Sequence, residues 1–77
     1  MNGKVLKLLT KIIRNKYPNI DSIQIIETGY NLSKPLFKIL INTHDQSYFN
    51  DPNLEHMIYS LFDSHMEDVY LFIYYEQ

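Results

Sequence analysis

The sequence predicts an α+β fold, a two-layer sandwich in which two helices cover one face of a three-stranded mixed sheet. Two segments repeat apolar residues at the helical period, and three segments show the alternating or continuous apolar pattern of strands. These segments follow one another in the order α-β-β-α-β. With 77 residues the chain should form a single domain over residues 1–77, whose core contributes only about 3–5 kcal/mol.

The first helix is expected over residues 3–16. An apolar stripe at i, i+3, i+4, i+7 and i+8 should face the sheet, and it comprises Val5, Leu8, Leu9, Ile12 and Ile13. A basic stripe at i, i+3, i+7 and i+10 lies beside it, and it comprises Lys4, Lys7, Lys11 and Arg14. Pro18 should end the helix, because the residue before a proline is disfavoured in the α region.

Two strands are expected next, over residues 22–28 and 36–42. They should form a β-hairpin with a rather long loop around the sequence GYNLSK. Gly29 and Asn31 in that loop can adopt the left-handed dihedral angles that turns need.

The second helix is expected from Pro52 to about His65, with Asp51 as its N-cap. The last strand should begin near Asp68. Because a helix connects the second and third strands, these two should be parallel, with a right-handed crossover. The predicted core comprises Val5, Leu8, Leu9, Ile12, Ile23, Ile25, Phe37, Ile39, Ile41, Leu54, Ile58, Leu61, Val69, Leu71 and Ile73.

The most apolar window, VYLFIYY at residues 69–75, is apolar on both faces of its strand. One set of alternate residues should face the helices, and the other should lie on an uncovered face of the sheet. Monomers seldom expose large apolar patches, so we expect partner binding there. The expected partner-binding residues are Leu36, Lys38, Leu40, Tyr70, Phe72 and Tyr74.

The sequence is compatible with several binding partners for this face. A second copy would give a symmetric dimer, and a larger protein could be inhibited or bridged by the chain. Nucleic-acid bases could stack on the aromatic rings. The rings could also be solvated strand formers with no partner. The third strand could lie at a sheet edge with little protection against pairing, or it could be central.

The net charge of −2 is unevenly divided. All seven basic residues lie within residues 1–38, whereas residues 39–77 carry seven of the nine acids. The basic stripe Lys4, Lys7, Lys11 and Arg14 therefore supports an alternative function, nucleic-acid binding through phosphate contacts. The order of elements resembles the type II KH layout, although the GxxG loop of KH domains is missing from this sequence.

Catalytic or metal-binding groupings are not expected. The chain has no cysteine, and Ser47, Ser60 and Ser64 lack the context of a nucleophile elbow. His44, Asp45 and His56 could converge where the second strand ends and the second helix begins, but their spacing matches no known ligand motif. We therefore expect a non-enzymatic protein without metal or cofactor.

The compartment and source are inferred from composition. Lysines interrupt the apolar runs of the N-terminal segment, so we expect neither a signal peptide nor a membrane span, and the lack of cysteine suits the cytoplasm. The abundance of Ile, Lys, Asn, Tyr and Phe is typical of low-GC genomes and suggests a bacterial or phage protein. The sequence thus predicts a small interaction module that acts by stoichiometric binding.

Overall fold

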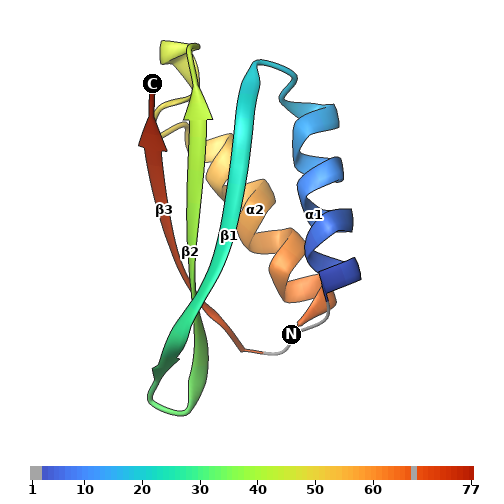
Figure 1. Cartoon of the computed structure of the whole chain (residues 1–77), viewed down its shortest axis with the longest axis vertical. Coiled ribbons are helices and arrows are strands. Elements are labelled where there is room, and N and C mark those ends of the chain that lie inside the picture. The colour runs from blue at the N-terminus through green and yellow to red at the C-terminus, as the bar shows by residue number, and fades with distance from the viewer. Residues whose placement is uncertain (1–2, 67) are drawn as a thin grey trace.

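The computed structural model describes residues 3–66 and 68–77, and it confirms the predicted α+β fold (Figure 1). The elements are α1 (Gly3–Lys16), β1 (Ile20–Asn31), β2 (Lys34–Thr43), η1 (Gln46–Tyr48), α2 (Pro52–His65) and β3 (Tyr70–Glu76). The short 3-10 turn η1 was not predicted. No helix in the described part of the chain is long and apolar enough to cross a membrane.

The sheet has the order β1-β2-β3, so β2 is central and β3 forms one edge. β1 and β2 are antiparallel, and β2 and β3 are parallel, which confirms the predicted pairing across the helical crossover. Figure 1 shows α2 crossing behind the sheet and α1 running alongside β1. The edge position of β3 decides between the two placements that the sequence left open.

Local chemistry explains where α2 begins and ends. The Asp51 carboxylate accepts a hydrogen bond from the Asn53 N–H at 3.0 Å, and Pro52 occupies the first turn, where its missing N–H has no intrahelical partner to lose. At the other end, the Met66 N–H donates to the Phe62 carbonyl at 2.8 Å. The predicted cap and starting residue of this helix are therefore confirmed.

The hairpin differs from the prediction, because its strands are longer and its loop is shorter. β1 extends to Asn31, and only Leu32 and Ser33 connect it to β2. Both residues have positive φ, 51° and 69°, as a two-residue type I′ turn requires. Gly29 does have a positive φ of 126°, but it lies within β1, next to a β-bulge, and not in a loop.

The core lies between the sheet and both helices, as predicted, with some exchanges of residues. Ile13, Ile20 and Phe62 are buried although the predicted core omitted them. Leu8 was predicted to be buried and is 46% exposed, so that prediction was wrong. α1 presents Leu9 and Ile13, one turn apart, to the core. Leu8 therefore falls on the shoulder of the helix. The buried core comprises Leu9, Ile13, Ile20, Phe37, Ile39, Ile41, Leu54, Ile58, Phe62 and Leu71.

Candidate protein-interaction surface

The strand register places the predicted partner-binding residues in cross-strand rows. Leu36 pairs with Tyr70, Lys38 with Phe72 and Leu40 with Tyr74 in the parallel β2–β3 ladder. Residues that alternate with these along β2, namely Phe37 and Ile39, are fully buried against the helices. The rows therefore lie on the opposite face of the sheet, because successive side chains of a strand point to opposite faces.

β1 adds a side chain to two of these three rows. Ile26 pairs with Lys38, and Gln24 pairs with Leu40. We call the resulting surface the open face, and its residues are Gln24, Ile26, Leu36, Lys38, Leu40, Tyr70, Phe72 and Tyr74.

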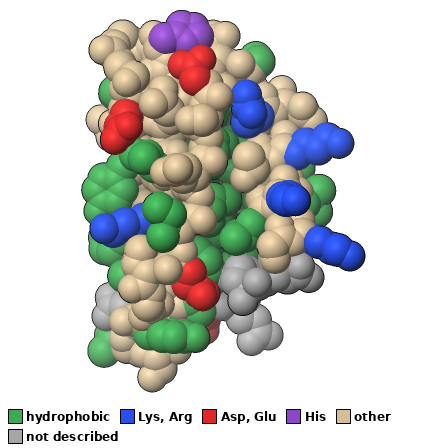
Figure 2. Space-filling view, viewed as in Figure 1, with side chains coloured by type: hydrophobic (Ala, Val, Ile, Leu, Met, Phe, Trp, Pro, Cys, Tyr) green, Lys and Arg blue, Asp and Glu red, His purple; other side chains and the backbone are tan. Residues whose placement is uncertain are grey.

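Large apolar side chains of the open face are about half exposed. Phe72 and Tyr74 each retain 48% of their accessible area, and Ile26 retains 47%. Figure 2 shows hydrophobic side chains gathered on the β3 side of the sheet, away from the row of basic side chains on α1. At one end of the face, the Lys34 ammonium lies 5.4 Å from the centre of the Tyr70 ring, a cation–π distance. The open face is thus a broad aromatic and aliphatic surface in contact with solvent.

The opposite side of β3 is fastened to α2 and to the loop before it. The Tyr75 hydroxyl donates to the Glu55 carboxylate at 2.6 Å, and its ring stacks on Phe49 with ring centres 5.5 Å apart. Burial, together with the hydrogen bond and the charge of Glu55, raises the pKa of Tyr75 above its ordinary value. The Tyr59 hydroxyl donates to the Leu71 carbonyl at 3.3 Å. These contacts hold the edge strand in place, so that Phe72 and Tyr74 are presented on a fixed surface.

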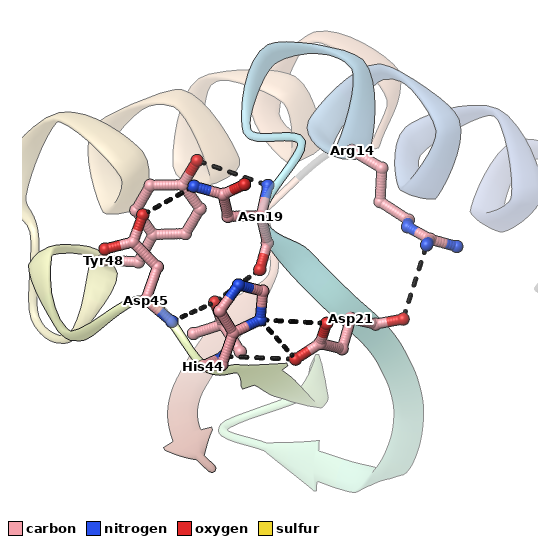
Figure 3. A network of polar contacts seen from close by, with 7 residues as sticks. Arg14, Asn19, Asp21, His44, Asp45 and Tyr48 are labelled. Atoms are coloured by element: carbon pink, nitrogen blue, oxygen red, sulfur yellow. Dashed lines mark hydrogen bonds and ion pairs between the residues drawn. The ribbon is translucent and has the colours of Figure 1, made fainter.

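A polar cluster ties the start of β1 to the end of β2 (Figure 3). The fully buried Thr43 donates its hydroxyl to the Asn19 carbonyl at 2.6 Å and accepts the Asp45 N–H at 3.1 Å. The Asn19 side-chain amide donates to the Asp45 carboxylate at 2.8 Å. Hydrogen bonds lower the pKa of Asp45, and the bond from Ser47 has a larger effect than the bond from Asn19. Each of these groups has a hydrogen-bond partner within the chain. We call Asn19, Thr43 and Asp45 the clasp, because they link the segment before β1 to the end of β2 and the segment after it.

His44 and Asp45 do not converge with His56 on a metal site. The His44 ring lies 3.1 Å from the Asp21 carboxylate, and both side chains are more than half exposed, whereas Asp45 faces Asn19 and Ser47. His56 is exposed on α2. Among the residues that the structure describes, no group of three or more His, Cys, Asp or Glu side chains is placed to hold a metal ion.

The basic stripe of α1 borders a groove that the sequence analysis did not identify. Lys7, Lys11 and Arg14 line it together with Leu6 and Ile25, and its volume is about 610 Å³. Leu6 lies outside the predicted apolar stripe. An apolar residue on the polar side of the helix was therefore the one sequence feature that could have indicated the groove. Recognising the groove also required the position of α1 relative to β1, which periodicity does not supply.

Comparisons of this chain with protein-family models, with curated proteins and with solved structures gave no match.

Proposed function

We propose that this chain is a small non-enzymatic interaction module that binds protein stoichiometrically through the open face, and that its first partner is a second copy of itself. The observation that carries the proposal is the half-exposed row formed by Ile26 and Phe72 on either side of Lys38. Larger exposed apolar patches on proteins typically mark interaction sites. Aromatic side chains such as Phe72 and Tyr74 commonly supply most of the binding energy at such sites.

Charge on this side of the sheet favours a second copy over an unrelated partner. Glu76 pairs with Asn42, two residues beyond the Leu40–Tyr74 row, whereas Lys38 lies two residues before that row. A copy packed face to face, with its strands reversed about the Leu40–Tyr74 row, would set Lys38 against the row that contains the partner's Glu76. Face-to-face sheets pack about 10 Å apart, a span that a lysine side chain can bridge toward a carboxylate. The surface is therefore self-complementary in charge as well as apolar.

Charge reversal tests this arrangement. Lys38→Glu should weaken self-association roughly fivefold or more, because two symmetric ion pairs at about 0.5 kcal/mol each become repulsive contacts. Glu76→Lys should have a similar effect. The double variant Lys38→Glu/Glu76→Lys exchanges the two charges and should recover most of the affinity. Sedimentation equilibrium measures the dimer dissociation constant of all four proteins.

The double variant tests whether Lys38 of one copy meets Glu76 of the other. If its affinity is no better than that of the weaker single variant, Lys38 and Glu76 do not meet in the dimer. Lys16→Glu is the matched control, because it reverses an exposed charge on α1, away from the open face. Its dissociation constant should stay within twofold of the parent protein.

A second candidate function, nucleic-acid binding, is favoured by the exposed basic side chains of α1, which Figure 2 shows as a row. The half-exposed rings of Phe72 and Tyr74, which could stack on bases, lie on β3 at the opposite edge of the sheet from β1 and α1. Titration of a single-stranded oligonucleotide at increasing salt tests this function. Affinity that falls steeply with salt supports it, and the absence of binding at 50 mM salt excludes it.

A further inference from the structure

The groove between α1 and β1 is apolar at its base and basic along its α1 side. Leu6 and Ile25 supply the apolar part, and Lys7, Lys11 and Arg14 supply three positive charges, while none of its described lining residues is acidic. Figure 2 shows it as a hollow between the sheet and the basic side chains. Its volume of about 610 Å³ lies within the range of roughly 300–1,000 Å³ that is typical of ligand sites.

The free edge of β1 borders this groove. β1 is the outer strand of the order β1-β2-β3, so alternate main-chain N–H and C=O groups along it point away from β2. At one end, the Arg14 guanidinium donates to the Asp21 carbonyl at 3.4 Å, as Figure 3 shows. A side chain of α1 thus already uses one main-chain acceptor of the strand, and the stretch toward Ile25 continues along the groove.

We propose that the groove takes a short, extended, acidic segment of another protein, which adds to β1 as a fourth strand. Main-chain hydrogen bonds to the free edge would supply affinity, as in other cases of strand addition. Alternate side chains of the segment would rest on Leu6 and Ile25, and the intervening carboxylates would pair with Lys7, Lys11 and Arg14. This site lies at the β1 edge and does not depend on dimerisation through the open face.

The spacing of the cations matches an extended peptide. Lys7 and Lys11 are four residues apart on α1, about 6 Å along the helix axis. Residues on one face of a strand repeat about every 6.6 Å. Because α1 runs alongside β1 (Figure 1), two successive carboxylates on one face of an added strand would meet Lys7 and Lys11.

The lining favours a peptide over nucleic acid. None of the described residues that line the groove is aromatic, whereas single-stranded nucleic acids are held chiefly by stacking on aromatic rings beside a positive surface. Conversely, an edge strand presents alternating donors and acceptors at the spacing of another polypeptide strand.

Fluorescence anisotropy with three labelled eight-residue peptides tests the proposal. One alternates glutamate with valine, one alternates lysine with valine, and one alternates glutamate with proline. The glutamate–proline peptide has the same charge as the first but lacks half of the main-chain donors. We expect the glutamate–valine peptide to bind at least tenfold more tightly than the other two. Amide shifts in NMR spectra should be confined to β1 residues 22–27 and to α1.

Substitutions in the protein locate the site. Lys7→Glu/Lys11→Glu should weaken binding of the glutamate–valine peptide at least tenfold, whereas Lys16→Glu, an exposed change on the same helix outside the groove, should change it less than twofold. Circular dichroism confirms that the variants keep the fold. Equal binding of the two acidic peptides, no binding up to 1 mM, or tighter binding of an eight-nucleotide oligothymidylate would each overturn the proposal.

Discussion

Leu32 and Ser33 connect β1 and β2 with backbone conformations that suit neither residue. Their φ angles of 51° and 69° belong to a type I′ turn, for which Asn-Gly is strongly preferred because these residues tolerate the left-handed region. Leu32 is 82% exposed, so its side chain contributes little burial in return. The turn therefore stores strain that could be removed without loss of packing.

Replacing Leu32 and Ser33 with Asn and Gly should stabilise the protein by about 1 kcal/mol. The urea midpoint of unfolding should rise while the slope stays constant. Ser33→Ala is the control, because it keeps a β-carbon at the same φ and should give no gain. An unchanged or lower midpoint for the Asn-Gly variant would contradict the strain argument.

Thr43 is the buried polar residue of the clasp, and its hydroxyl has two main-chain partners. Thr43→Val keeps the shape of the side chain but leaves the Asn19 carbonyl and the Asp45 N–H without that partner, which should cost about 1–3 kcal/mol. Thr28→Val removes an exposed hydroxyl of β1 that donates only a long hydrogen bond, at 3.4 Å, to the Leu36 carbonyl, and it should cost less than about 0.5 kcal/mol. Equal urea midpoints for the two variants would show that the clasp adds nothing to stability.

The Tyr75–Glu55 hydrogen bond connects β3 to α2. The pKa of Tyr75 is raised in the folded protein, mainly by burial, so the folded state holds this proton more tightly than the unfolded state does. The associated stability is fully present below the ordinary tyrosine pKa of about 10 and is lost as the pH rises above it.

Tyr75→Phe should therefore reduce the loss of stability between pH 9 and pH 11. Urea midpoints measured across this interval should fall more steeply for the parent protein than for the variant. Tyr30→Phe is the control, because Tyr30 is 72% exposed on the hairpin, and its slope should match that of the parent. If the urea midpoints of the parent and of Tyr75→Phe fall equally with pH, the Tyr75 hydroxyl does not cause the loss of stability at high pH.

The elements that the sequence predicted best are those with a strict repeat and a distinct end signal. The apolar period of α2 and its Asp51–Pro52 start placed that helix correctly, and the alternation in β3 separated Leu71 from Phe72. The hairpin was misjudged because Leu32 and Ser33 carry no turn chemistry, and because a bulge near Thr28 breaks the two-residue alternation. Local patterns do not encode such strain, which tertiary pairing imposes.

The sequence predicted one of the two candidate surfaces, the open face, and did not predict the groove. The open face followed from the alternation of side chains, since a period of two fixes the face once the core is known. The edge position of β3 and the groove beside β1 did not follow, because strand order and helix placement are properties of the assembled chain.

Two helices cover one side of the three-stranded sheet, and the other side presents Ile26, Phe72 and Tyr74 half exposed. Phe72→Asp should therefore weaken self-association by roughly a hundredfold, because each copy would bury an uncompensated carboxylate. Leu8→Asp is the matched control, because Leu8 is similarly exposed, at 46%, but lies on α1. If Leu8→Asp disrupts association equally, general surface hydrophobicity is responsible and the open face is not.

If a second copy covers the open face, the unmodified chain should dimerise reversibly. Sedimentation equilibrium at concentrations from about 1 to 200 μM should then show a monomer–dimer equilibrium whose dimer is populated within this range. A single species of monomer mass at every concentration would contradict it.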